Sequence, residues 1–251
     1  MVNTLTKAHI NLFALLRNIE DLCEMDEESK SLISGKDLSI LFSIKGGPQG
    51  RLIFKDGKCR FERGPGSCSM KLYFKSPRHF NEMIDGKANP IPLKGITRIK
   101  FLTNEFTRIT DRLAYFLKPT DELLKDPHYF NINTYLTAYT AFYALGEIGN
   151  TDPVGKLNAS RIPDGIISIS VLSGPAVHID VKEGLLTVGK GAHNKPRASM
   201  TFQSAEAANA ILNGKADTYT CMGNGSFSVN GYIPMLDNMN KLLFQVPAYV
   251  K

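Results

Sequence analysis

Tryptophan is absent from this chain, cysteine occurs only four times, and no apolar run approaches the length of a membrane span. A bilayer-spanning helix needs about 20 consecutive apolar residues, so none is expected. The apolar run 10–16 lacks a small-residue cleavage site and continues a helical pattern, which argues against a signal peptide. The four cysteines form no CxxC pair, and this favours reduced thiols in a cytoplasmic protein over disulfides or a zinc site.

Motifs of catalysis and of cofactor binding are also missing. His178 and Asp180 are the only local pairing of a histidine with a carboxylate, and no serine or cysteine elbow accompanies them. The glycine-rich pieces at 45–50, 189–194 and 223–231 match neither the phosphate loop nor the dinucleotide fingerprint. Metal ligands do not cluster at short spacing. We therefore expect no enzyme, no metal and no cofactor.

What the sequence does contain is a duplication. The stretches "SPRHFNEMIDGKANPI" (76–91) and "SAEAANAILNGKADTY" (204–219) both begin with a serine suited to capping a helix and later stop on Gly-Lys-Ala. Upstream, residues 46–61 match residues 173–188 at nearly the same offset, including a hairpin signal in each. A unit of about 125 residues is a normal domain length. We expect two domains of one fold, residues 1–120 and 121–251.

The pattern within each copy predicts an α+β fold: a helix, three strands, a helix, two strands and a helix. In the second copy the helices are expected at 131–148, 205–213 and 234–244. Its strands are expected near 166–172, 176–182 and 185–188, with a fourth segment at 198–202 and two more strands at 217–222 and 226–230. In the first copy, 39–44 has the alternation of a half-buried strand, 89–101 matches the last two strands, and 106–117 is the closing helix.

Positive charge is concentrated in the first copy. Residues 1–120 hold 20 Lys and Arg against 13 Asp and Glu, whereas residues 121–251 hold 10 against 11. Much of the excess lies on the first hairpin, where charges that alternate with apolar residues usually mark the solvated face of a sheet. The other interpretation is an anionic partner, such as transient contact with a membrane surface. Nucleic acid is not expected, because no aromatic platform or basic helix accompanies the charge.

Residues 208–243 resemble the sterol carrier protein 2 domain. The matching features are a helix ending in Gly214-Lys215, the Gly-flanked strand 225–231 and a final amphipathic helix. The resemblance implies a mostly antiparallel sheet of five strands whose helices could enclose an apolar tunnel for fatty acids, fatty acyl-CoA or sterol-like lipids, bound without chemical change. The first copy keeps Gly86-Lys87, but its segment 95–102 has no second glycine, which predicts a degenerate final turn.

The second copy is expected to be the better binder, because methionines collect in its sheet and closing helix and methionine suits an adaptable wall. The first copy has stiffer or bulkier residues in the matching elements. An alternative is a structural or oligomerisation module whose cores are simply filled. The residues expected to line the ligand site are Met200, Phe202, Ile211, Met222, Phe227, Val229, Met235, Met239 and Leu243.

Overall fold

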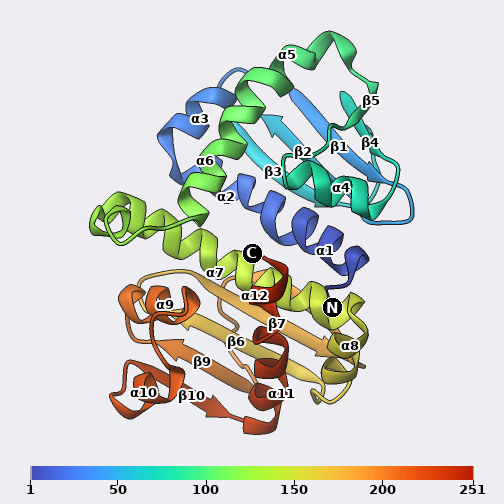
Figure 1. The fold of residues 1–251 in the computed structure, drawn as a ribbon. Helices are drawn as coiled ribbons and strands as arrows, with labels where there is room; N and C mark the ends of the chain where they lie inside the picture. The colour runs from blue at the N-terminus through green and yellow to red at the C-terminus, as the bar shows by residue number, and fades with distance from the viewer. Residues whose placement is uncertain (1, 251) are drawn as a thin grey trace. The chain divides into compact units, whose positions relative to one another are not determined.

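The structure, a computed structural model, describes residues 2–250. The chain divides into two compact units, residues 1–120 and 121–251, which we call the N-terminal unit and the C-terminal unit. Each consists of one sheet, and along the chain helices precede the first strand, separate the fourth strand from the fifth, and follow the fifth (Figure 1). In the part of the chain described, no helix combines the length and the apolar character needed to cross a membrane.

The N-terminal unit begins with helical turns and then forms a sheet. Its first helices are α1 (Thr4–Ile10), the π-helical turn η1 (Asn11–Leu15), the short turn η2 (Leu16–Asn18), α2 (Ile19–Met25) and α3 (Glu27–Ile33). The strands are β1 (Leu38–Ile44), β2 (Gln49–Lys55), β3 (Lys58–Arg63), β4 (Met70–Phe74) and, after α4 (Pro77–Ile84), β5 (Ile91–Lys94). The chain then turns helical through η3 (Ile96–Arg98), α5 (Ile99–Phe101), η4 (Leu102–Phe106) and α6 (Thr107–Leu117).

The C-terminal unit repeats this plan. After the turn η5 (Leu123–Lys125), its helices are α7 (Pro127–Thr151) and α8 (Pro153–Ala159), and its first strands are β6 (Gly165–Val171), β7 (Ala176–Lys182), β8 (Leu185–Lys190) and β9 (Ala198–Phe202). The remaining elements are α9 (Ala205–Leu212), α10 (Thr218–Gly223), β10 (Phe227–Gly231), α11 (Ile233–Leu243) and α12 (Val246–Tyr249). The predicted strands 176–182 and 198–202 have the observed bounds.

Both sheets have five strands in the same spatial order, β3-β2-β1-β4-β5 and β8-β7-β6-β9-β10. Every pair is antiparallel except the central ones, β1 with β4 and β6 with β9. The predicted mostly antiparallel α+β fold is therefore confirmed. The central pairs also identify equivalent positions, because Phe42 lies opposite Leu72 in one sheet and Ile169 opposite Met200 in the other.

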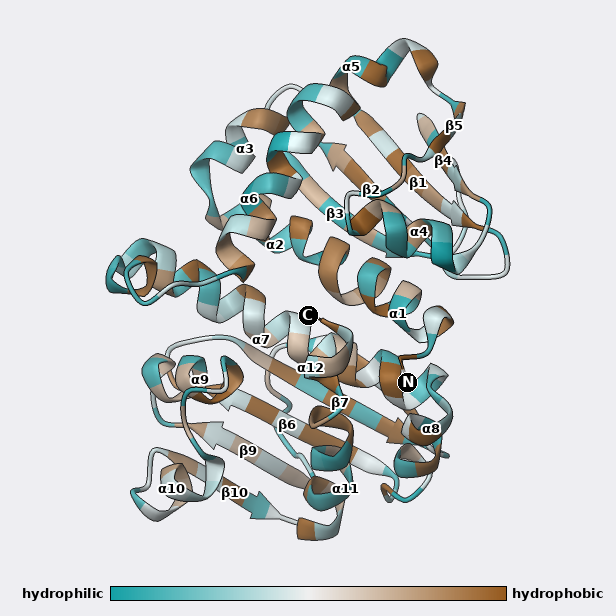
Figure 2. Cartoon of the chain, in the orientation of Figure 1, coloured by the Kyte–Doolittle hydropathy of each residue, from teal (hydrophilic) through white to brown (hydrophobic). Residues whose placement is uncertain are grey.

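One face of each sheet is apolar and covered by helices. Along β7 the buried residues alternate with polar ones, and α7 and α11 pack over the sheet of the C-terminal unit. Figure 2 shows hydrophobic residues along the central strands. The expectation of a half-buried strand at 39–44 was wrong: Leu41 and Ser43 on its other side are also buried. β1 is the middle strand of the five and lies farthest from both edges of the sheet.

Two predicted strands are helical instead. The strand predicted at 217–222 is replaced by α10 (Thr218–Gly223), because the Asp217 carboxylate accepts a hydrogen bond from the Thr220 amide at 2.8 Å and caps a helix there. In the N-terminal unit, the chain leaves the sheet at Lys94, and residues 96–101 coil into η3 and α5. Each unit thus has four strands before its middle helix and one strand after it.

The N-terminal unit does not lack the glycine turn after its last strand. Gly95 follows β5 with φ 84° and Gly231 ends β10 with φ 87°, so these two glycines are equivalent. A Cβ on either would lie within 2.6 Å of a backbone carbonyl oxygen, that of Ser69 or of Arg197. The expectation of a degenerate turn was wrong because the C-terminal unit has extra residues in α10, which displaced the sequence match.

A buried amide pair links the first helix of each unit to its middle helix. Asn11 donates to the Oδ1 of Asn81 at 3.0 Å, and Asn209 donates to the Oδ1 of Asn133 at 2.7 Å. All four side chains are at most 6% exposed. Because an unpaired buried amide is costly, each pair specifies how its two helices pack on one another.

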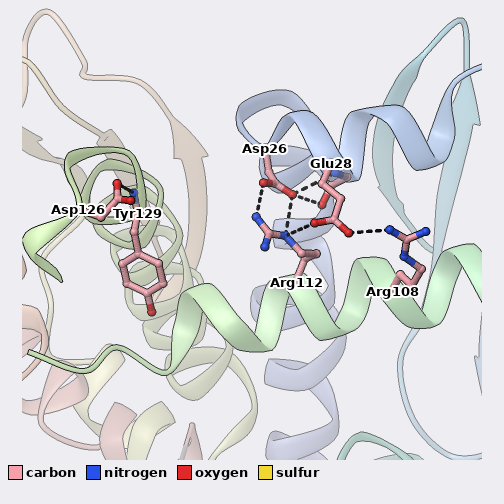
Figure 3. A network of polar contacts seen from close by, with 7 residues as sticks. Asp26, Glu28, Arg108, Arg112, Asp126 and Tyr129 are labelled. Carbon is pink, nitrogen blue, oxygen red and sulfur yellow. Dashed lines mark hydrogen bonds and ion pairs between the residues drawn. The ribbon is translucent and has the colours of Figure 1, made fainter. Parts of the chain in front are cut away.

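An ion-pair network ties α3 to α6 in the N-terminal unit (Figure 3). Arg112 donates to both oxygens of Asp26, at 3.1 and 2.6 Å, and Ser29 donates to Asp26 from its amide and its hydroxyl. Burial alone would raise the pKa of Asp26, but the bonds from Arg112 and Ser29 outweigh it and hold the pKa below its ordinary value. Arg108 bonds the more exposed Glu28 at 2.7 Å.

Candidate functional site

The sheet of the C-terminal unit brings four of the predicted site residues onto one face. Phe227 pairs with Phe202 and Val229 pairs with Met200 across the β9 and β10 strands. Directly paired residues of antiparallel strands point to the same side. The two phenylalanine rings lie 4.8 Å apart, centre to centre. Met200, Phe202 and Phe227 are buried and Val229 is half-buried, so these side chains form an apolar wall.

Two helices supply the facing residues. Met235 and Met239 lie one turn apart on α11, are fully buried, and α11 packs on β9. Leu243 continues the same stripe at the end of α11 and is half-buried. Ile211, on α9, is also half-buried, and α9 packs on β9 and α7. The predicted residues therefore gather around β9, with one exception.

Met222 lies apart from this group. It belongs to α10 and not to a strand, and its side chain is 41% exposed. Its neighbour Cys221 is the buried residue of that helix. The sequence placed Met222 in the wall because the segment 217–222 was predicted as a strand.

An apolar cavity of about 10 Å³ adjoins this wall. Its lining residues Ile169 and Val171 pair with Met200 and Phe202, so the cavity is next to the predicted site. A cavity needs about 10–15 Å³ to hold one water molecule, and small-molecule pockets have about 300–1,000 Å³. This cavity is therefore too small for a lipid. The sequence prediction had missed its lining residues Ala138, Phe142, Ile169, Val171, Pro175, Ala176 and Val177.

The corresponding interior of the N-terminal unit is filled by aromatic rings. Phe80 contacts Phe74 and Phe42 edge to face, with ring centres 4.9 and 6.4 Å apart. The register places Ile169 where Phe42 stands, and the duplicated helix places Ala208 where Phe80 stands. The C-terminal unit thus has smaller side chains at two of the three positions that interlock in the N-terminal unit.

The polar face of the second sheet carries the histidine and carboxylate that the sequence singled out. His178 and Asp180 lie on β7, on the side opposite its buried valines and isoleucine. His178 contacts the ring of His193 with centres 6.1 Å apart, and one of its ring nitrogens bonds the Gly191 carbonyl at 2.9 Å. Among residues 2–250, no group of three His, Cys, Asp or Glu side chains could hold a metal ion.

A larger and more open hollow, of about 390 Å³, lies on the N-terminal unit. It is formed where the end of α3 meets the turns after β5. Lys36 pairs with Glu105 at its edge, at 2.6 Å, and lies over the Phe101 ring. Its charged lining residues are Lys36, Asp37, Arg98, Lys100 and Glu105. The mixed charge makes it unlike the apolar wall of the C-terminal unit.

No protein-family model matches this chain, and no curated protein matches it. Among solved structures, the chain is similar to the sterol carrier protein domain 2 of Helicoverpa armigera, with 20% identity, a TM-score of 0.36, and coverage of 46% of this chain and 91% of that one. It is similar to apo sterol carrier protein 2 of Yarrowia lipolytica, with 19% identity, a TM-score of 0.34 and coverage of 44% and 91%.

A palmitated sterol carrier protein 2-like 2 from Aedes aegypti has 18% identity, a TM-score of 0.32 and coverage of 41% of this chain and 90% of that one. The comparisons thus return the family that the sequence motifs resemble. Likenesses at this identity and TM-score do not identify a ligand. The nature of the ligand is therefore inferred from the side chains of this chain.

Proposed function

We propose that the C-terminal unit binds an apolar or amphipathic small molecule, such as a fatty acid, fatty acyl-CoA or sterol-like lipid, and does so without covalent chemistry. The N-terminal unit then provides a filled structural domain. The observation that carries this proposal is the exchange of interlocking phenylalanines for smaller residues at Ile169 and Ala208, beside a wall containing Met200, Met235 and Met239.

The small size of the cavity beside this wall places a condition on this function. A cavity of about 10 Å³ cannot contain an acyl chain, so the ligand must displace side chains or helix α11 as it enters. Methionine has three rotatable bonds and no branching, and it can repack around a ligand at low cost. To enter between interlocked phenylalanines, as in the N-terminal unit, a ligand would have to separate the packed rings.

A matched pair of substitutions in the full-length chain tests the proposal. Ile169→Phe gives the C-terminal unit the residue of the N-terminal unit, and Phe42→Ile makes the reverse change. We expect Ile169→Phe to weaken binding of a fluorescent long-chain fatty acid at least about tenfold, because an added ring fills the space beside the wall. Phe42→Ile should leave binding unchanged while it lowers stability by about 1–3 kcal/mol through lost packing.

Chain length provides a second measurement on the same protein. Each buried methylene contributes about 0.8 kcal/mol, or roughly fourfold in affinity before ordering costs reduce it. Affinity should therefore rise with acyl length and then level off. Equal affinity across the series, or loss of binding in Phe42→Ile alone, would show that the ligand site has been assigned wrongly.

The small cavity also favours a second candidate, a structural module whose cores take no ligand. Solvent extraction of the purified protein, followed by mass spectrometry, separates the two. A ligand carrier purified from its natural host should release a lipid in defined proportion to protein. A structural module should release none and should bind none of the fatty acids in the series.

A further inference from the structure

Residues 93–100 of the N-terminal unit expose apolar side chains at regular spacing. Leu93 is 56% exposed, Ile96 is 66% exposed and Ile99 is 41% exposed. Ile96 begins the 3₁₀ helix η3, in which side chains three residues apart lie above one another, so Ile96 and Ile99 point to the same side. Figure 2 shows hydrophobic and hydrophilic residues alternating through the end of β5 and α5.

The same segment is rich in cations and free of carboxylates. Between Asp85 and Glu105 the chain has four lysines and arginines and no acidic residue. The side chains of Lys94, Arg98 and Lys100 are on exposed residues. Lys94 donates to the Cys68 carbonyl at 2.6 Å, and Arg98 to the Asp37 carbonyl at 3.2 Å. These bonds to neutral carbonyls orient the cations without cancelling their charge.

Few carboxylates lie on the neighbouring elements, and one of them is in an ion pair. Asp37 and Glu105 line the hollow of about 390 Å³ beside this segment, together with Lys36, Arg98 and Lys100. The Lys36 ammonium pairs with Glu105 and lowers the pKa of that carboxyl. With three cations against two carboxylates, the lining has a surplus of one positive charge at the mouth of a hollow open to solvent.

The chain is anchored on both sides of the two exposed isoleucines. Gly95 has a positive φ of 84° and lies so close to the Ser69 carbonyl oxygen that a Cβ there would be only 2.6 Å away. Phe101 is buried and contacts Phe54, with ring centres 5.5 Å apart. The exposed isoleucines are thus held outward between two anchored points. Contact with a partner therefore requires little additional ordering of this segment.

The equivalent corner of the C-terminal unit offers an internal comparison. After Gly231, Tyr232 and Ile233 are also exposed, at 42% and 44%. From Ser226 to Asn240, however, the only charged residue is Asp237. Exposed apolar residues and a cation occur at this corner in both units, since the Arg197 guanidinium lies 4.6 Å from the centre of the Tyr232 ring, but cations within the segment itself belong to the N-terminal unit alone.

We propose that residues 93–100 form a docking surface for an anionic lipid bilayer. Leu93, Ile96 and Ile99 enter the interface between headgroups and acyl chains, while Arg98 and Lys100 lie at the lipid phosphates. This combination distinguishes a bilayer from nucleic acid, which would use the cations and leave three aliphatic side chains in water. The inference does not rest on the proposed ligand site, because the two lie on different units.

Flotation of the full-length protein with vesicles tests the electrostatic part. The vesicles contain phosphatidylcholine alone or mixed with phosphatidylserine, and the variant combines Lys94→Gln, Arg98→Gln and Lys100→Gln. Each cation near an anionic surface is worth about fivefold in binding, so the variant should bind phosphatidylserine vesicles on the order of a hundredfold more weakly. The matched control removes the same charge from exposed positions of the first hairpin through Lys55→Gln, Lys58→Gln and Arg60→Gln.

The apolar part is tested with Ile96→Ser and Ile99→Ser together, against Tyr232→Ser and Ile233→Ser in the C-terminal unit. The wild-type protein and this control should keep part of their vesicle binding at high salt, because buried apolar surface is not screened. The Ile96 and Ile99 variant should bind weakly at low salt and be released completely at high salt. All substituted side chains are on exposed residues, and thermal unfolding should verify that each variant is folded.

Three results with vesicles would overturn the proposal. One is equal binding to neutral and anionic vesicles, and another is an equal loss in the hairpin control. The third is salt release of the Ile96 and Ile99 variant that matches the wild type. Binding of an oligonucleotide that depends on Lys94, Arg98 and Lys100, with no vesicle binding, would likewise assign this surface to a different partner.

Discussion

Removal of Arg112 should destabilise the N-terminal unit more than removal of any other cation in its network. The Asp26 carboxylate is 2% exposed and receives two of its hydrogen bonds from Arg112. Breaking a buried pair by deleting one partner costs about 3–5 kcal/mol. The Arg112 side chain is 26% exposed, so water can solvate part of the site, and we expect about 2–3 kcal/mol for Arg112→Met.

The same substitution should change how stability depends on pH. In the wild type the pKa of Asp26 is lowered from 3.8, so its stabilisation is present above that value and is lost as pH falls through the still lower folded pKa. Without Arg112, two of the causes that lower this pKa are lost, its hydrogen bonds and its charge, so the folded pKa of Asp26 should be higher than in the wild type. The stability deficit of the variant relative to wild type should therefore be smallest at low pH and should widen as pH rises through the interval between the two folded pKa values.

Urea unfolding followed by far-UV circular dichroism measures both effects, since the chain has no tryptophan for fluorescence. The control is Arg108→Met, because Arg108 bonds Glu28 with side chains 59% and 42% exposed. An exposed pair of this kind is worth less than about 1 kcal/mol. Equal destabilisation by the two variants, or a deficit of Arg112→Met that is constant with pH, would refute the assignment of Asp26 as a buried and charged anchor.

Two further predictions concern the backbone and the thiols. Gly231→Ala should destabilise the protein by about 1–3 kcal/mol in urea unfolding, because φ is 87° and the new Cβ would lie 2.4 Å from the Arg197 carbonyl oxygen. Gly223→Ala, which meets nothing within 4 Å, should be neutral or slightly stabilising, and an equal effect of both would contradict this. Burial raises the pKa of the Cys59 thiol, whereas Cys68 is half-buried. Iodoacetamide should therefore label Cys68 first by mass spectrometry, and equal rates in the folded protein would disprove the burial argument.

The sequence predicted those parts of the fold that depend on local alternation and turn chemistry. The strands at 176–182 and 198–202 and the middle helices follow from period-2 spacing, hairpin signals and serine caps. It failed for α10, where Thr218 and Tyr219 favour a strand but the Asp217 carboxylate caps a helix. It failed again at Ile96, because the turn at Gly95 takes the chain away from the sheet whatever the propensity of the residues that follow.

The residues predicted to line the site share one face where they lie on strands, whereas those predicted on helices do so only in part. Met200 and Phe202 share a face because strand alternation is strict. Phe142, on α7, could not be assigned to the cavity, since that helix is buried around most of its circumference and periodicity does not indicate which side meets the sheet. The size of the cavity could not be predicted from the sequence either, because it depends on how closely side chains from several elements pack.

A chain that carries one fold twice offers each helix two sheets to pack on, and exchange between repeats is a common route to misfolding. The differing interiors described above reduce this risk. If α4 packed on the second sheet, Phe80 would have to fit where Ala208 belongs, and α9 on the first sheet would leave a void beside Phe42 and Phe74. The divergence of the two cores therefore favours packing of each helix on its own sheet during folding, whether or not either unit holds a ligand.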